Sequence, residues 1–158
     1  ISFHSYPYTS LRSNEKIKMN KYKYISSQIA QYVYMMRRAR TKETESRNYN
    51  KAIHLMMQRM DKPVLYIFSN SSEDIQWIKD NFHFRVPVKY VDNNNPDYED
   101  FRLMMYCKSF ILSNSTFSWW VSYLSEYKSK IVIAPSRWNN GFWDQSDIYM
   151  KEWKIIDV

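Results

Sequence analysis

The chain has 158 residues, of which 44% are hydrophobic, 25% charged and 18% aromatic, which suits one folded domain and excludes wholesale disorder. Single copies of glycine and cysteine (Gly141 and Cys107) exclude glycine-rich nucleotide-binding fingerprints, an intramolecular disulfide and a cysteine-based zinc site. The net charge of +7 favours a polyanion, a phosphorylated small molecule or an anionic membrane surface as partner, although solubility alone also accounts for it.

The first part of the chain is interpreted as one short strand followed by a basic insertion. The strand is expected at Ile1–His4, and the insertion, at about 5–48, is rich in Lys, Tyr, Ser, Asn and Arg. Apolar residues spaced for one face of a helix occur in it at Ile25, Ile29, Val33 and Met36. We therefore expect a partly helical insertion of the kind that often forms a functional loop or lid; a flexible basic tether is the alternative.

From residue 49 onward, helical patterns alternate with short apolar runs, which predicts βαβ units around a parallel sheet. The expected helices are Tyr49–Met60, Glu73–Asn81, Pro96–Cys107 and Thr116–Glu126. The expected strands are Val64–Phe68, Val86–Val91, Phe110–Ser113 and Lys130–Ala134. The whole chain, residues 1–158, is thus expected to be a single α/β domain.

Start signals accompany three of these helices. Asn95 offers a cap before Pro96 at the first helical position. Ser71, with Asp74 three residues later, resembles a capping box. The helix expected at Thr116–Glu126 begins within a run of three residues that all cap well, Asn114, Ser115 and Thr116.

Two strand-to-helix turns, residues 68–72 and 113–118, are rich in hydroxyl and amide side chains. In an open parallel sheet, such turns lie at the carboxyl ends of the strands, where ligands bind. The free N–H groups and positive dipole of a helix N-terminus attract phosphate, and Ser and Thr hydroxyls add further donors. From residue types alone, helix capping is the simpler explanation of these side chains. The two turns are nevertheless candidate phosphate sites, because two of them occur in one sheet.

Other chemistry finds little support in the sequence. His4, His54 and His83 lie far apart, and no metal-binding spacing, DxD motif or nucleophilic triad can be assembled. We therefore expect no metal and no other cofactor, and the sequence identifies no catalytic residue.

Residues 110–124, FILSNSTFSWWVSYL, resemble the NSxFSWWxAWL segment of the α-1,2-fucosyltransferase family, glycosyltransferase family 11. Neighbouring segments agree in order: YIFSNSSEDIQWIKDNF at 66–82 is similar to the family's YIFSDDxxWxKxNF, and KIVIAPSRW at 130–138 to its KIVIAPxxW. A Leu-Met pair and a Cys-Lys pair precede the hydroxyl turn, as in the family. The resemblance covers roughly residues 48–156.

The resemblance implies a Rossmann-like sheet flanked by helices, which would form the C-terminal, donor-binding half of a GT-B glycosyltransferase. It implies inverting, metal-independent transfer of L-fucose from GDP-fucose to a galactoside hydroxyl in α-1,2 linkage. The partners would be a GDP-sugar donor, which is a substrate, and a galactose-containing glycan acceptor, with peripheral membrane association and no nucleic acid.

The expected location is cytoplasmic or membrane-peripheral, of bacterial type, in preference to the Golgi. No apolar run of about 18 residues and no signal-peptide pattern is visible. Because the chain begins without Met, we expect it to be part of a longer protein.

Matched position by position, the resemblance implies a donor-binding set. Its members are His4, Ser69, Asn70, Asn114, Ser115, Thr116, Phe117 and Ser118. The turn at 114–118 would bind the pyrophosphate, residues 69–70 the nucleoside, and the histidine the guanine.

The sequence departs from the family at Tyr6, where the family has an arginine that clamps the pyrophosphate. A phenol supplies neither the charge nor the bidentate geometry of a guanidinium group. Either Arg12 or another basic residue of the insertion supplies the charge, or the chain is a catalytically weak or inactive GT-B-type module that binds nucleotide or glycan. A basic nucleic-acid-binding protein is the remote alternative, prompted by charge and aromatic content without a matching motif.

Overall fold

The computed structural model describes residues 24–27, 42–69, 71–91, 95–138, 144 and 146–157, and residues 24–27 and 42–47 are described for the backbone alone. The strands are β1 (Tyr24–Ser27), β2 (Val64–Ile67), β3 (Val88–Tyr90), β4 (Ser109–Ile111), β5 (Ile131–Pro135) and β6 (Lys154–Ile156). The helices are α3 (Lys42–Met57), α4 (Ser72–Asn81), α5 (Asp97–Met105), α6 (Thr116–Leu124) and the short 3-10 helix η1 (Ser146–Ile148).

The strands form one sheet in the order β3-β2-β1-β4-β5-β6, and every pair of neighbours is parallel. At its centre, Ile25 of β1 is paired with Leu65 of β2 on one side and with Ser109 of β4 on the other. This is the strand order of the Rossmann fold. The expected α/β class, a Rossmann-like parallel sheet flanked by helices, is therefore confirmed.

β1 lies inside the segment expected to be a partly helical insertion, so that expectation is wrong for residues 24–27. The run YISS has only four residues, and it is hydrogen-bonded to a strand on each side. Pairing with two neighbours decides its conformation, which a helix-like spacing of apolar residues cannot reveal. α3 also begins earlier than expected, at Lys42 instead of Tyr49. The strand expected at Ile1–His4 lies outside the described residues.

The four helices and four strands expected between residues 49 and 134 are present, and apart from the start of α3 their observed ends lie within three residues of the predicted ones. Ser71 caps α4 as predicted, because its side chain accepts a hydrogen bond from the amide of Asp74 at 3.1 Å. α5 begins one residue later than expected, since Pro96 is its extended cap residue and not its first helical residue. β6, a run of three residues, was not predicted.

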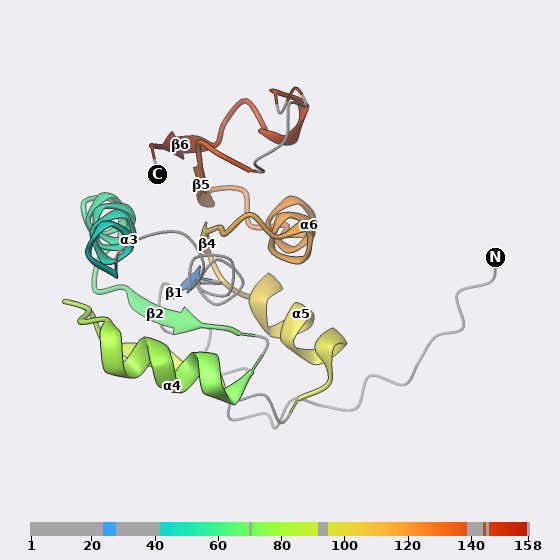
Figure 1. Ribbon diagram of the computed structural model, residues 1–158. Helices are drawn as coiled ribbons and strands as arrows, with labels where there is room; N and C mark the ends of the chain where they lie inside the picture. The colour runs from blue at the N-terminus through green and yellow to red at the C-terminus, as the bar shows by residue number, and fades with distance from the viewer. Residues whose placement is uncertain are drawn as a thin grey trace.

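Helices cover both faces of the sheet (Figure 1). α3 and α4 bury one face, where Ile53, Met56 and Ile78 pack with Leu65, Ile111 and Ile133 of the strands. α5 and α6 bury the other face, where Met104 and Val121 pack with Phe110, Leu112 and Val132. Complete burial of each such side chain stabilises the fold by roughly 1.5–3 kcal/mol. With a core on each face, the sheet is a rigid support for the turns that follow the carboxyl ends of its strands.

Candidate functional site

The strand order reverses direction between the neighbouring strands β1 and β4: from β1 the chain adds strands on one side, and from β4 on the other. Among the described elements, β1 is followed by α3, on one face, and β4 by α6, on the other. In parallel α/β sheets, ligands bind in the crevice beyond the carboxyl ends of two such strands. The turn from Ser113 to Thr116 joins β4 to α6 and therefore lies at this position.

The turn leaves backbone donors free at the start of α6. Ser115 is the extended N-cap residue, and its side chain makes no capping hydrogen bond. Its amide donates to the carbonyl of Ser113 at 2.8 Å, and its carbonyl accepts the amide of Trp119 at 3.0 Å. The amides of Thr116 and Phe117, in the first helical turn, have no acceptor within the helix. An anion at this position would satisfy them.

The electrostatics of the helix ends separate α6 from its neighbours. The first turn of α4 contains Glu73 and Asp74, and that of α5 contains Asp97, Glu99 and Asp100. Among these three described helices, α6 is the one whose first turn contains no acidic residue. Acidic side chains at a helix N-terminus neutralise the dipole and repel phosphate. The start of α6 is therefore the best of the three for an anionic ligand.

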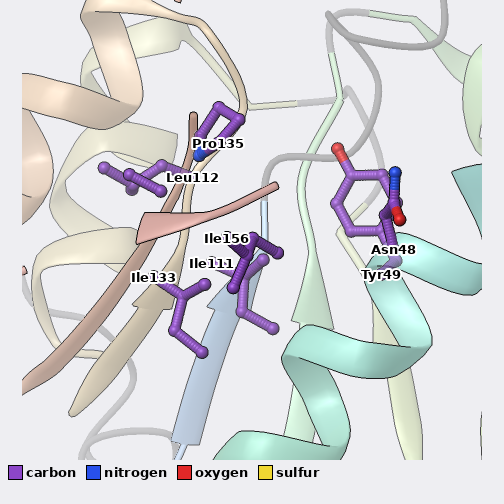
Figure 2. A pocket seen from close by; sticks show the side chains of 8 residues that line it. Asn48, Tyr49, Ile111, Leu112, Ile133, Pro135 and Ile156 are labelled. Carbon is purple, nitrogen blue, oxygen red and sulfur yellow. The ribbon is translucent and has the colours of Figure 1, made fainter. Parts of the chain in front are cut away.

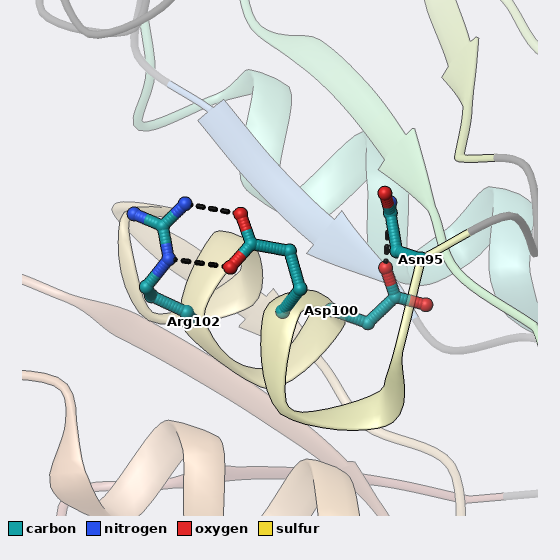
Figure 3. A network of polar contacts seen from close by, with 4 residues as sticks. Asn95, Asp100 and Arg102 are labelled. Atoms are coloured by element: carbon teal, nitrogen blue, oxygen red, sulfur yellow. Dashed lines mark hydrogen bonds and ion pairs between the residues drawn. The ribbon is translucent and has the colours of Figure 1, made fainter. Parts of the chain in front are cut away.

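Two of the three acids of α5, Glu99 and Asp100, have hydrogen-bond partners nearby in the sequence (Figure 3). Arg102 donates to Glu99 through Nε, at 2.8 Å, and also through Nη2. Asn95 donates through Nδ2 to Asp100 Oδ1 at 3.1 Å, a different contact from the backbone cap expected of it. The hydrogen bond from Arg102 lowers the pKa of Glu99, which keeps this carboxylate charged at neutral pH. The start of α5 is thus anionic and unsuited to phosphate.

Of the residues predicted in the α6 turn, Ser115 and Ser118 are buried and Phe117 is half-buried. Ser118 is fully buried, and its hydroxyl donates to the carbonyl of Ser115 at 3.0 Å. Phe117 packs edge-on against Phe101 of α5, with ring centroids 5.2 Å apart. These side chains support the helix. Thr116 is exposed and Asn114 half-buried, so their side chains remain accessible for a ligand.

The second predicted turn follows β2, the strand next to β1. Ser69 is 7% exposed, and its hydroxyl accepts the amide of Ser71 at 3.4 Å. The side chain of Ser71 caps α4, whose first turn is acidic. Local hydrogen bonds therefore account for these hydroxyls, and the acids of α4 disfavour phosphate here.

Ser113, two residues after the end of β4, lies in the predicted turn at 113–118 but is not in the predicted donor-binding set. It is 1% exposed, and its hydroxyl oxygen has no hydrogen-bond partner among the described residues. A buried hydroxyl without a partner costs about 1–3 kcal/mol, so such groups are rare unless a ligand or water satisfies them. Ser125, at the opposite end of α6, has the same property and lies away from the site edge.

An apolar hollow lies at the same edge of the sheet, beside the ends of β4, β5 and β6 (Figure 2). Asn48 and Tyr49 of α3 stand across it from Ile111 and Ile156 of the sheet. It contains about 320 Å³ of empty space, part of it open to solvent. Its lining comes from four distant parts of the chain, which is why no local motif reveals it.

Several predicted residues lie outside the described part of the chain, namely His4, Tyr6, Arg12 and Asn70. Within the described part, no group of three or more His, Cys, Asp or Glu side chains is arranged to hold a metal ion. No helix there is both long and apolar enough to cross a bilayer.

The far end of α6 is fixed by a lysine. The ammonium of Lys130 donates to the carbonyls of Ser122 and Ser125, at 2.6 and 2.7 Å, which are otherwise unsatisfied at a helix C-terminus. Burial lowers the pKa of Lys130, and the negative charge of Glu152 raises it by a smaller amount. This contact and the bond from Trp119 Nε1 to the carbonyl of Ile148, at 2.7 Å, hold the helix in position against the sheet.

The parallel sheet and the helix N-terminus at its switch point define a Rossmann-like α/β domain. Residues 11–157 match the sequence model described as Glycosyl transferase family 11, and the chain belongs to this family of glycosyltransferases. His4 precedes the matched segment, so the match gives its predicted role no support.

Two relatives from Escherichia coli are similar to the chain. One is named O-antigen biosynthesis glycosyltransferase WbnK, at 33% identity over 107 residues, which cover 66% of this chain and 34% of the relative. The other is named alpha-1,2-colitosyltransferase, at 34% identity over 96 residues, which cover 58% of this chain and 32% of the relative. The aligned part is about a third of the length of these curated relatives. No solved structure gives a significant match.

Proposed function

We propose that this chain is the donor-binding half of a GT-B glycosyltransferase that binds a GDP-sugar and transfers its sugar to a galactose-containing glycan. The observation that supports this most strongly is the acid-free start of α6 at the switch point of the sheet. Family membership supports a transferase, and a nucleotide-sugar donor supplies the diphosphate that this helix end would bind.

In this proposal, the amides of Thr116 and Phe117 bind the diphosphate, with the side chains of Asn114 and Thr116 beside them. Ser113 contributes its buried hydroxyl, which otherwise lacks a partner. Negative charge grows on the diphosphate as the bond to the sugar breaks. Preorganised donors at the place where charge develops stabilise the transition state most, and losing one commonly costs several kcal/mol.

The transferred sugar is proposed to be L-fucose, in α-1,2 linkage, as the sequence resemblance implies. Colitose is the second candidate, because one relative at 34% identity is named an alpha-1,2-colitosyltransferase. Incubating the full-length protein with each GDP-activated sugar and a β-galactoside acceptor separates the two candidates by the mass of the product. GDP binding by the full-length protein without turnover of either donor would favour the inactive binding module.

Of the remaining predicted residues, Ser115 acts in this proposal through its backbone, and Ser118 and Phe117 support the helix. Ser69 and Asn70 are proposed to lie near the nucleoside, and Arg12 to supply the charge that Tyr6 lacks. Peripheral association with a membrane, in a bacterial-type cytoplasmic location, is part of the same proposal.

The test is to place an acid at the start of α6. Thr116→Glu adds a negative charge at an exposed first-turn position, which stabilises the helix by roughly 0.3–1 kcal/mol but repels a diphosphate. We expect GDP affinity, measured by calorimetry, to fall by at least about tenfold while thermal stability does not fall. The matched control is Ser72→Glu, at the same first-turn position of α4, where GDP affinity should not change. Equal losses in both variants, or none in Thr116→Glu, would refute the assignment.

A further inference from the structure

α6 has an apolar face on the side turned away from the sheet. Its sequence, TFSWWVSYL, contains no charged residue. The inner positions Ser118, Val121 and Ser122 are buried. Trp120, Tyr123 and Leu124 point the other way and are 50%, 50% and 45% exposed. An exposed helix face without any charge is unusual on a soluble protein and commonly marks an interaction surface.

Tyr127 follows just beyond the helix and is 40% exposed. We call these four side chains, Trp120, Tyr123, Leu124 and Tyr127, the outer aromatic face. Two of its rings are held by ring contacts: Tyr123 stacks on Trp119, which lies outside the face, at 5.0 Å between centroids and meets Trp120 edge-on at 5.9 Å. Because these rings are already ordered, docking would cost little side-chain entropy.

Basic side chains flank the outer aromatic face. Two lysines lie at its border, Lys108 and Lys128. The ammonium of Lys108 lies 5.5 Å from the ring centroid of Tyr127, and Lys128 follows this tyrosine directly and is exposed. Glu126, directly before Tyr127, is also exposed, so Lys108, Lys128 and Glu126 together give this border a net charge of +1.

We infer that the outer aromatic face docks the chain onto an anionic lipid surface. Trp and Tyr prefer the boundary between headgroups and acyl chains, where Leu124 would also be buried. Lys108 and Lys128 would lie near lipid phosphates, where each basic residue adds attraction. A protein partner fits less well, because lysine is depleted in protein–protein interfaces whereas Trp, Tyr and Lys together are typical of membrane interfaces.

Docking through this face has a consequence for the reaction. Trp120 is about one helical turn, ~6 Å along the helix, from Thr116 at the start of α6. A lipid surface at the face would therefore hold the start of α6 near headgroup level, where an acceptor glycan displayed from that surface could reach it. The docking face gives a surface to the peripheral membrane association in the proposed function, and this consequence rests on the proposed donor site.

The experiment is co-sedimentation of the full chain with vesicles of phosphatidylcholine alone or of equal parts phosphatidylcholine and phosphatidylglycerol. We expect binding to the mixed vesicles and a blue shift of tryptophan emission. Trp120→Ser with Tyr123→Ser should reduce the binding on the order of tenfold, since each aromatic side chain contributes to interfacial affinity. Tyr98→Ser, at a tyrosine that is 74% exposed on α5, is the matched control and should bind as the unchanged chain does.

A second variant keeps the test independent of folding. Lys108→Glu with Lys128→Glu leaves the rings in place and should weaken binding to the mixed vesicles. Calorimetry with GDP should give the same affinity for both double variants as for the unchanged chain, which separates a failure of this inference from a failure of the proposed function. No vesicle binding, or equal binding to neutral and anionic vesicles, would overturn the inference. So would a dimer in light scattering that the Trp120 and Tyr123 changes dissolve.

Discussion

Ser113→Ala tests whether the orphan hydroxyl at the end of β4 serves a ligand. The side chain is 1% exposed and has no partner among the described residues, so folding removes it from water without replacing its hydrogen bonds. That cost is about 1–3 kcal/mol, and alanine avoids it while leaving only a very small cavity. We expect the variant to be more stable by about 1 kcal/mol. For a chain of this length, the melting temperature would rise by about 2–4 °C.

Ligand binding should change in the opposite direction. A hydrogen bond from a hydroxyl to a charged group is worth about 1.5–3 kcal/mol, so GDP affinity should fall by about tenfold or more. The control is Ser125→Ala, which removes the other buried, unpartnered hydroxyl, at the far end of α6. It should raise stability in the same way and leave GDP affinity unchanged.

Scanning calorimetry and GDP titration of the two variants give four values to compare. Opposite effects on stability and affinity in Ser113→Ala, with a gain in stability alone in Ser125→Ala, are expected of a polar group kept for function. A loss of stability in Ser113→Ala would show that the hydroxyl is bonded in the folded chain. Unchanged GDP affinity would remove Ser113 from the site.

Three further changes test the frame around the site. Lys130→Met should lower the free energy of unfolding by about 1–3 kcal/mol in urea titration, because the carbonyls at the end of α6 lose charge-assisted bonds; no change would mean that water replaces the ammonium. Tyr149→Phe removes the hydrogen bond to the carbonyl of Pro135, at 2.8 Å, and should cost about 1 kcal/mol by the same measurement, whereas a gain in stability would contradict the contact. Glu99→Gln should cost less than about 0.5 kcal/mol at pH 7, because the pair with Arg102 is partly exposed. That pair lowers the folded-state pKa of Glu99, so its contribution to stability is full above the ordinary pKa of 4.5 and is lost as the pH falls through the lowered pKa. A stability difference between Glu99→Gln and the unchanged chain that grows in acid would be inconsistent with this.

The sequence predicts the elements from residue 49 to 134 because their signals are local. The cap at Ser71 and the apolar runs of β2 and β5 act within a few residues of one another. β1 escapes prediction because its four residues become a strand only between β2 and β4. β6 is shorter still, at three residues, and pairs only with β5.

The candidate site is predictable in its position but not in each of its side chains. The turn at 113–116 follows from a buried run ending in hydroxyl residues before a helix. Residue type suggested Ser118 as a ligand, yet its spacing from Val121 and Ser122 places it on the buried helix face, a signal that the sequence did contain. The missing partner of Ser113 depends on its three-dimensional surroundings, and no pattern in the sequence shows it.

The exposed aromatic residues of α6 are the opposite case. Trp120 and Tyr123 belong to the most distinctive motif of the chain, and apolar content favours placing them in the core. In the structure each is half exposed, because Val121 and the small Ser118 and Ser122 already fill the contact with the sheet. Residue type alone could not assign them to the outer face.

The most direct measurement of the central claim follows the backbone amides of the labelled chain by nuclear magnetic resonance as GDP is added. If the start of α6 binds the diphosphate, the amides of Thr116 and Phe117 should show the largest shifts, with saturation at the affinity found by calorimetry. The amides at the start of α5, near Asp97, should shift little. Saturable GDP binding that leaves Thr116 and Phe117 unmoved would contradict the account.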